Sequence, residues 1–494
     1  MSTAAVAKSD AALAERPVGY RAIAQKVDAR ILVISRMATR MGMSTLSYGA
    51  ITYLARSGAS QFQISLVNSA QFLAALLFAV QAGVLADLLS KRTAMLIAFV
   101  MQAALCFLIP SFLGTGVGTL MLLMFLTSAL SQLVTPSVKA MVALVSTTEE
   151  LATTSALVNI TGGFASAIGS SFLAPILIKT TSIDVVIYVA GVLYALGALR
   201  TWRLPTKEKG TTLAKAVTQV NWKPEALSIR QCGEWLFRNK QIGSIVLIGA
   251  TVVAMFEAFN NLIPLYVKDV LNSDPANAIY IFAPAGIGYL VGAVFGPRFI
   301  HHWGERKLAM IGVGTMVGGM ICFGIIGVVA PFVAWANPLR LLELFGVEFN
   351  QLVLAAGVIA APTNFGSVVT GAAAQTYINR RVPPVAQGAT FGIEEMLENM
   401  LTLVVVLLVG LVATLIGSQA VMIVAPVIVF VVTLYLVRYS YRGGGVSASL
   451  RDDARYLMPA ESDAPIDVAA LAFGRGEEPD VPKPTPRPNG TVED

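Results

Sequence analysis

The sequence predicts an all-α polytopic membrane protein whose helices form two pseudo-symmetric six-helix bundles. Of its 494 residues, 55% are hydrophobic and 13% are charged, and the mean hydropathy is +0.70. This composition is too apolar and too poor in charge for a soluble globule. The chain also contains twelve long apolar stretches, and a loop between two of them has a weaker echo in the second half. Together these observations indicate a duplicated membrane protein.

The twelve apolar stretches are each about 20 residues long or longer, which is the length that a helix needs to cross a bilayer. Lipid offers the backbone no hydrogen-bond partners, so each stretch is expected to form a helix that satisfies its own backbone. The predicted spans are 31–54, 62–86, 93–113, 117–144, 151–179, 184–202, 242–267, 277–299, 307–331, 349–378, 388–416 and 419–440.

Changes in composition divide the chain into five predicted regions. The longest polar interval separates six spans from six, and it is expected to hold an amphipathic helix at the membrane surface. The tail is rich in Gly, Ser, Pro and acidic residues and lacks the apolar surface needed for folding. The regions are a cytoplasmic N-terminal segment (1–30), an N-terminal six-helix bundle (31–203), a cytoplasmic central linker (204–240), a C-terminal six-helix bundle (241–440) and a disordered cytoplasmic tail (441–494).

The distribution of Lys and Arg predicts the orientation, because cytoplasmic loops of membrane proteins carry an excess of basic residues. With both termini inside, the cytoplasmic segments hold 29 of the 35 basic residues. We therefore predict a multi-pass protein of the cell inner (plasma) membrane with cytoplasmic N- and C-termini. The net charge of +6 then reflects topology, and no nucleic-acid partner is expected. The other basic residues are Arg36 and Arg40 in the first span and Arg56, Lys179, Lys268 and Arg340 in outer loops.

Residues that catalysis or metal binding would need are scarce. The two histidines, His301 and His302, lie together in one inner loop, and the three cysteines are far apart in the sequence. No Walker motif is present, so ATP hydrolysis is not expected. We predict no enzyme activity, no cofactor and no metal site. Any energy-requiring process carried out by this chain would then be driven by an ion or substrate gradient.

Several loop motifs resemble those of a known family. The segment 83–92, GVLADLLSKR, resembles the signature G-x-L-A-D-R-x-G-R-K of the major facilitator superfamily, which lies between the second and third helices of a twelve-helix transporter. Its echo is 296–307, and 135–140 follows the family's fourth-to-fifth helix pattern. The segment 379–388, NRRVPPVAQG, resembles the tenth-to-eleventh helix loop of bacterial exporter branches. The likeness covers about residues 20–440 and implies the major facilitator fold.

The resemblance implies an inner gate around this loop. In the family, the position matching Asp87 lies near the start of the eleventh helix and acts as a conformational latch. Lys91 and Arg92 would pair with acidic groups or helix carbonyl ends across the gate, in contacts that break when the halves rock. The alternative is a basic turn whose Asp caps a helix, and Leu88 and Ser90 depart from the signature. The predicted gate residues are Gly83, Asp87, Lys91, Arg92, Arg306, Glu394 and Glu395.

Two carboxylates within predicted spans are candidates for binding substrate or a coupled proton. Charged side chains cost about 2.5–3.5 kcal/mol at the centre of a membrane helix on insertion scales, so they indicate function. Glu257 lies midway along the seventh span, one turn before Asn260 and Asn261, and Glu398 precedes Asn399 in the eleventh. The alternative is structural: a hydrogen bond to a neighbouring helix for Glu257, and polar packing at the inner gate for Glu398.

Three residues of the first two spans are further candidates for a substrate site. Arg40 shares a helix face with Arg36 and could attract an anionic headgroup or a substrate carboxylate, with snorkelling to the inner interface as the alternative. Asn68 and Gln71 share a face through their three-residue spacing. These amides would either line a cavity or bond between helices.

We predict a secondary active transporter that moves an amphipathic or lipophilic small molecule by alternating access, in the direction of efflux. The pattern is similar to bacterial drug, siderophore and lysophospholipid transporter branches.

Proton coupling stays open, because the fourth span lacks the Arg of many proton antiporters and Gly42-Met43 stands where related exporters have Gly-Asp. The expected partners are membrane lipid, the substrate and protons, with a monomeric chain. A lysophospholipid transporter is one alternative, and a non-transporting membrane assembly factor or sensor is another.

Overall fold

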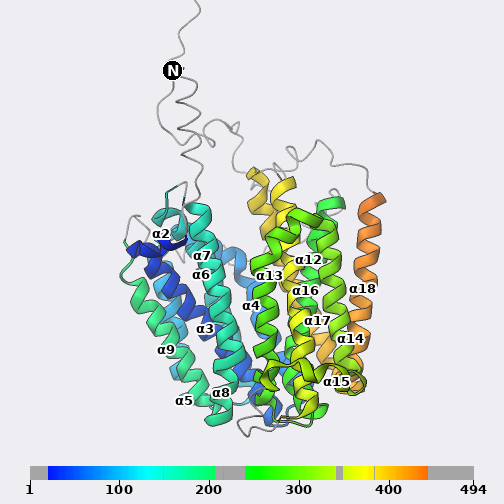
Figure 1. Cartoon of the computed structure of the whole chain (residues 1–494). Helices are drawn as coiled ribbons and strands as arrows, with labels where there is room; N and C mark the ends of the chain where they lie inside the picture. Colours follow the sequence, from blue (N-terminus) through cyan, green and yellow to red (C-terminus); the bar gives the residue numbers. More distant parts are fainter. Residues whose placement is uncertain are drawn as a thin grey trace, which may run out of the picture.

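The computed structural model describes residues 20–147, 150–205, 215, 240–340, 349–382 and 384–442. Within that part the chain forms helices and no strands, in two groups that stand side by side (Figure 1). One group comes from the first half of the chain and the other from the second. The predicted all-helical membrane architecture in two bundles is therefore confirmed. The predicted segment before residue 20, most of the central linker with its amphipathic helix, and the predicted tail beyond Arg442 lie outside the described residues.

The N-terminal half runs from α2 to α9. Its fifth long helical segment is continuous but includes a π-helical turn, η1, where the backbone hydrogen bonds span five residues. Its elements are α2 (Tyr20–Gln25), α3 (Val27–Arg56), α4 (Gln61–Leu88), α5 (Lys91–Leu113), α6 (Val117–Val145), α7 (Leu151–Ile168), η1 (Gly169–Leu173), α8 (Ala174–Thr180) and α9 (Ile183–Thr201).

The C-terminal half runs from α12 to α18. The predicted ninth span, 307–331, is not one continuous helix but is interrupted at Ile325 between two helices. Its elements are α12 (Lys240–Asp269), η2 (Pro275–Ala278), α13 (Ile279–Trp303), α14 (Glu305–Gly324), α15 (Ile326–Val333), η3 (Ala334–Ala336), α16 (Gln351–Arg381), α17 (Pro384–Ile416) and α18 (Ser418–Arg442).

Eleven helical segments in the described part are long and apolar enough to cross a membrane. The predicted first span is α3, which has 30 residues but is not among the eleven. Its charged side chains, Arg36 and Arg40 among them, lower its hydropathy. Its length and its packing against α7 and α9 are nevertheless those of a spanning helix. The predicted number of twelve spans therefore depends on counting α3.

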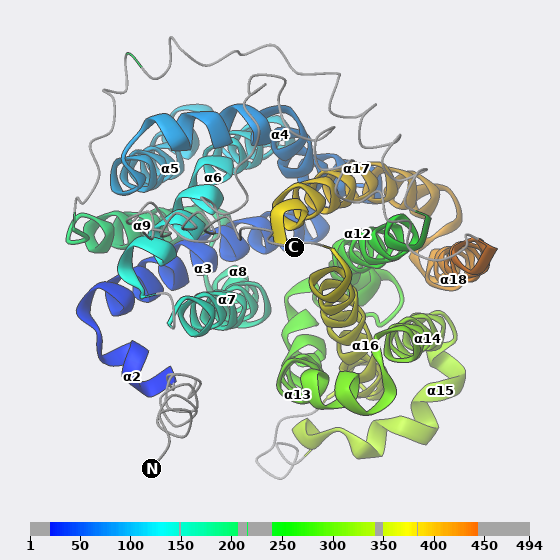
Figure 2. The ribbon, with the colours of Figure 1, turned by 90° about the horizontal axis from the view of Figure 1, so that it is seen from above.

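Both described ends of the chain lie on the same side of the molecule, where α2 begins and α18 ends at the top of Figure 1. We call this side the terminal end and the other side, where α3 connects to α4, the opposite end. The view from above shows α4 of the N-terminal half beside α17 of the C-terminal half (Figure 2), in agreement with their extensive contact. A chain that crosses the membrane an even number of times places its ends in this way.

Small residues allow close helix packing in the C-terminal half, as is typical of helices in lipid. On α13, Gly288 faces Ala361 of α16 so closely that a Cβ atom would overlap the Ala361 carbonyl group. Gly312 of α14 and Gly366 of α16 approach each other in the same way. The backbones of α13 and α14 therefore pack directly on α16.

We expect Gly288→Ala to destabilise the fold by about 1–3 kcal/mol, because the added methyl group meets backbone atoms that cannot rotate away. Thermal unfolding of the purified protein measures the effect. Gly296→Ala on the same helix is the matched control, because a Cβ atom there meets nothing within 4 Å. An equal loss of stability in both variants would show that the close contact is not the cause.

An ion pair joins two helix starts at the terminal end. Lys26, just before α3, donates a hydrogen bond to the carboxylate of Glu150, just before α7. The same carboxylate accepts a bond from the backbone N–H of Thr147 at 3.4 Å. The Lys26 hydrogen bond, followed by the smaller contribution of Thr147, lowers the pKa of Glu150 below its ordinary value.

A lowered pKa in the folded state fixes the sign of the pH dependence. The contribution of Glu150 is fully present above its ordinary pKa and is lost as the pH falls through the folded value. We expect Glu150→Gln to lower the thermal stability at neutral pH and to match the original protein in strong acid. Thermal unfolding of both proteins across this pH range measures the difference. A difference that stays constant down to strong acid contradicts a role for the carboxylate charge.

Candidate functional site

A cavity of about 420 Å³ lies between the two halves. Its walls come from α3, α4, α7 and η1 on one side and from α12, α13 and α16 on the other. Six of the eight sequence-predicted substrate or coupling residues line it, although they come from three different helices. They are Arg40, Asn68, Gln71, Glu257, Asn260 and Asn261.

Amides and hydroxyl groups dominate the N-terminal wall of the cavity. Gln71 donates through Nε2 to Asn68 Oδ1 at 2.6 Å and lies 3.5 Å from Ser47 Oγ. The two amides therefore share a helix face, as their spacing predicts. Ser44 of α3 and Ser166 of α7 hydrogen-bond to each other across the same wall. The wall is held by hydrogen bonds and still presents polar atoms to the cavity.

The π-helical turn brings further hydroxyl groups to this wall. Ser170 and Ser171 belong to η1 and both line the cavity. The turn begins at Gly169, where a Cβ atom would press against Met41 and Thr45 of α3. Only a glycine lets the two helices meet here. Sequence reasoning missed these serines, although the Gly-Ser-Ser run was the available signal, since π-helical turns occur frequently at functional sites.

The C-terminal wall combines aromatic rings with one carboxylate. Phe256, Phe282 and Tyr289 line the cavity together with Glu257 and Asn260. Glu257 is half-buried, and the described part of the chain shows no hydrogen bond or ion pair to its carboxylate. It is the one acidic residue among the described residues that line the cavity. A carboxylate in this position is available to a ligand or to a proton.

Arg40 faces the cavity from the N-terminal half. Its side chain is exposed although it lies well along a membrane helix, as expected for a group that lines an open cavity. Its aliphatic part lies beside Gly162 of α7, whose missing side chain leaves room for it. Glu395 of α17 attracts it electrostatically from the C-terminal half. Arg36 lies against the same glycine but does not line the cavity.

Polar contacts between the halves close the cavity at the opposite end. Asn261 donates through Nδ2 to Ser65 Oγ at 2.7 Å, and its backbone carbonyl accepts a bond from Gln61 Nε2 at 3.1 Å. Gly410 of α17 packs so tightly on Ser65 that a side chain there would overlap it. Asn261 therefore joins the halves as well as lining the cavity. We call Gln61, Ser65, Asn261 and Gly410 the closure cluster.

Charged groups around the closure cluster also join the halves. Arg56 pairs with Asp274 at 2.9 Å, and Lys268 donates to the carbonyl oxygen of Ala55 at 3.0 Å. Lys179 donates to Asn277 Oδ1 at 2.9 Å. Each of these contacts connects one half to the other at the opposite end.

Residues 32–371 match the sequence profile of the Major Facilitator Superfamily. This protein belongs to the Major Facilitator Superfamily. One curated relative, Multidrug resistance protein 3 of Bacillus subtilis (strain 168), is 27% identical over 124 residues, which cover 25% of this chain and 24% of that protein.

Solved transporter structures share the fold. The nucleoside transporter NupG superposes with a TM-score of 0.60 at 15% identity, covering 84% of this chain and 99% of that chain. A bacterial homologue of the human lysosomal transporter Spinster, in an inward-facing and unoccupied conformation, gives a TM-score of 0.61 at 13% identity, covering 87% and 98%. At these identities the likeness concerns the fold alone.

The loop that carries the superfamily signature makes three contacts within the N-terminal half. The side chain of Asp87 is 82% exposed and pairs with Lys91 at 3.2 Å, one helical turn along the chain. Lys91 also donates to the carbonyl oxygen of Ala86 at 2.9 Å, and Arg92 lies over the ring of Trp202 at 5.8 Å. None of these interactions reaches α17. The expected partner of Asp87 is the start of the eleventh helix, where the side chains of residues 384–389 lie outside the described part, so this contact stays a prediction.

Two predicted gate residues of the C-terminal half, Arg306 and Glu394, make contacts within their own half. Arg306 donates to the hydroxyl group of Tyr377 at 2.9 Å. Glu394 is buried against Gly249 of α12, whereas Glu395 is exposed. At Gly83, a Cβ atom would meet nothing within 4 Å, so no described element packs against the signature glycine. The hydrogen bonds and ion pairs described above between the halves of this facilitator lie at the opposite end.

Glu398 and Asn399 do not lie with the other six predicted substrate or coupling residues. Neither is among the described residues that line the cavity. Asn399 donates through Nδ2 to the backbone carbonyl of Glu395 at 2.8 Å, and Glu398 interacts electrostatically with Glu394 and Glu395. The two predicted carboxylate candidates, Glu257 and Glu398, therefore do not form one site.

The closure cluster leads to a test by substitution. We expect Gly410→Val to separate the halves at the opposite end, because the new side chain occupies the space of Ser65. Spin labels on Ser57 and Asn272, in a background without the native cysteines, report this distance by pulsed electron paramagnetic resonance. Gly392→Val on the same helix is the control, because a Cβ atom there meets nothing within 4 Å. An unchanged distance distribution in Gly410→Val would show that this contact does not hold the halves together.

Proposed function

We propose that this chain is a secondary active transporter that moves an amphipathic small molecule through the central cavity by alternating access. The observation that carries the proposal is the position of the cavity, which lies between the halves and is closed by polar contacts at the opposite end. If those contacts broke and the two halves came together at the terminal end, the same cavity would open to the other side of the membrane. Membership of the superfamily supports transport over the alternatives of an assembly factor or a sensor.

The charge distribution supports an orientation for this cycle. The excess of basic residues in the segments at the terminal end favours a cytoplasmic location for that end and for both termini. In a plasma membrane, the structure would then face the cytoplasm. The partial relative is named for multidrug resistance, which supports export as the direction.

The chemistry of the two walls supports an amphipathic substrate over a purely apolar one. Serine hydroxyls and the amides of Asn68 and Gln71 would bind a hydrogen-bonding head group, and Phe256 and Phe282 would contact an apolar or aromatic part. The lining residues include Arg40 and Glu257, which have opposite charges. A substrate carrying both polar and apolar parts matches this surface better than an aliphatic hydrocarbon does.

Glu257 is our candidate for proton coupling. A carboxylate within the membrane that faces a cavity can exchange protons with the water there. Glu398 is a weaker candidate, because it does not line the cavity and interacts with its acidic neighbours instead. The lysophospholipid alternative depended on Glu398 and Asn399, and the cavity gives it no additional support.

Transport in proteoliposomes tests the function. A panel of amphipathic dyes, ferric siderophores and lysophospholipids is supplied with and without an imposed pH gradient. We expect gradient-driven flux of an amphipathic compound in the original protein and its loss in Glu257→Gln, with gradient-independent exchange retained. Glu398→Gln is the matched control and should keep the gradient-driven component.

Each outcome of this experiment has a defined meaning. Flux of none of the compounds contradicts the transporter proposal. Gradient-driven flux that survives Glu257→Gln but not Glu398→Gln moves the coupling role to the other carboxylate. Flux of lysophospholipids alone would favour the lipid alternative.

A further inference from the structure

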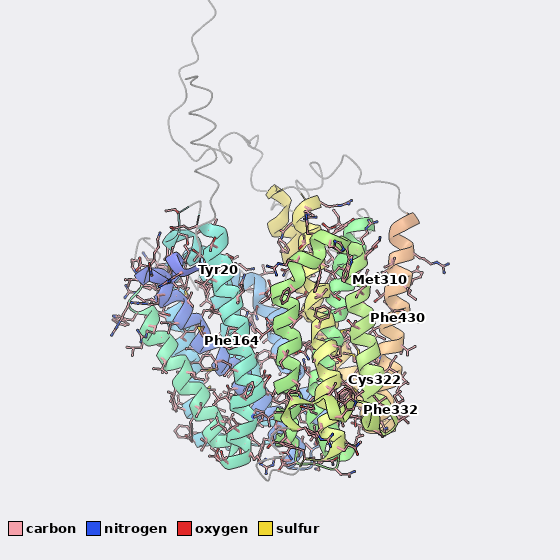
Figure 3. All side chains as sticks on the ribbon, in the orientation of Figure 1. Tyr20, Phe164, Met310, Cys322, Phe332 and Phe430 are labelled. Carbon is pink, nitrogen blue, oxygen red and sulfur yellow. The ribbon has the colours of Figure 1, made fainter. Side chains whose placement is uncertain are left out.

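A second cavity, of about 400 Å³, lies within the C-terminal half. It shares no lining residue with the central cavity and lies among α12, α14, α16 and α18. Figure 3 shows that Met310, which lines it, is nearer the terminal end than Cys322 on the same helix. The cavity therefore lies in the part of this half that faces the terminal end.

The wall of this cavity is largely aliphatic. Ile245 and Ile248 of α12, Met310 and Ile311 of α14, and Val437 of α18 contribute most of its larger side chains. Thr370, Ala373 and Ala374 of α16 complete it. A wall of this composition suits a hydrocarbon chain.

Two of the helices around the cavity, α14 and α18, pack against each other beyond it. At the opposite end, Gly324 of α14 packs on Ile423 of α18, and Gln419 Nε2 donates to the Gly324 carbonyl oxygen at 2.9 Å. Toward the terminal end, Ile311 and Val437 lie on two sides of the cavity. Ile311 is 42% exposed, and α18 lies at the outer edge of the bundle in Figure 2. A lipid chain can thus reach the cavity from the bilayer.

Basic side chains surround the mouth of the cavity. Arg306 and Lys307 both line it, and Lys307 is exposed. The one carboxylate in the lining, Glu305, already pairs with Arg380. Arg381 lies over the ring of Tyr377 at 4.8 Å, on which Arg306 also stacks at 5.5 Å. Positive charge is therefore in excess where the apolar cavity reaches the membrane surface.

We propose that this cavity binds an anionic glycerophospholipid, with an acyl chain between α14 and α18 and its phosphate group near Arg306 and Lys307. The aliphatic wall of the cavity matches the acyl chain of such a lipid, and the basic residues at its mouth match the phosphate group. Anionic head groups attract basic residues at the membrane surface, and an acyl chain fills an aliphatic cavity that would otherwise lack contacts. The proposal does not depend on the identity of the transported substrate.

Native mass spectrometry of the full-length protein in detergent tests the proposal directly. The protein is incubated with phosphatidylglycerol or with phosphatidylcholine of identical acyl chains, and the bound lipid is counted. We expect one tightly held phosphatidylglycerol in preference to phosphatidylcholine. Lys307→Gln should weaken phosphatidylglycerol binding roughly fivefold, the effect of removing one basic residue from an anionic lipid site.

Two further variants separate the head group from the chain. Arg298→Gln removes an exposed cation from the same end of the same half but outside the cavity, so lipid binding should not change. Ala374→Phe fills the aliphatic part and should reduce the binding of both lipids. Because Lys307 is exposed, its substitution remains informative even if Ala374→Phe folds poorly.

Three results would overturn the proposal. Equal retention of the two lipids by the original protein would show that no anionic head group is recognised. An equal effect of Arg298→Gln and Lys307→Gln would show that only the overall surface charge acts. Complete displacement of the lipid by inorganic phosphate at physiological concentration would indicate a site for a soluble anion.

Discussion

The hydrogen bond between Asn261 of α12 and Ser65 of α4 is the contact on which the relative position of the two halves depends. In lipid, hydrocarbon side chains gain little from leaving one apolar environment for another, so helices associate through close packing and polar bonds. The closure cluster supplies both, because Gly410 lets α17 approach Ser65 while Asn261 and Gln61 provide the bonds. The closed end of the cavity, and hence its access from the terminal end, follows from this contact.

The signature loop contains a local ion pair at the terminal end. In this conformation the side chain of Asp87 is largely exposed and pairs with Lys91 one turn away. That pair is exposed and of small energetic value, so it offers little resistance to a rearrangement. The hydrogen bonds and ion pairs described between the halves lie at the opposite end. Local pairing at one end and inter-half bonding at the other are therefore two aspects of one conformation.

The sequence predicted the helices well because lipid imposes one requirement on every span, whereas the site depends on details that hydropathy does not contain. The amides Asn68 and Gln71 were predictable, since polar groups on one helix face are unusual in a membrane. Hydropathy also does not show that Glu398 of α17, a helix packed against α4 and α12, is not among the described residues that line the cavity. Ser170 and Ser171 were missed because a serine within a membrane helix can bond to its own backbone, as Ser170 does to Ser166.

The low hydropathy of α3 is a consequence of the site and not a defect in a spanning helix. Two arginines would each cost a few kcal/mol if they faced lipid. Here the side chain of Arg40 lines the central cavity, its stem fits the space beside Gly162, and Glu395 attracts it from the other half. Each of these features lowers the cost of keeping the charge within the membrane. The helix that falls short as an apolar span is thus the one that brings positive charge to the cavity.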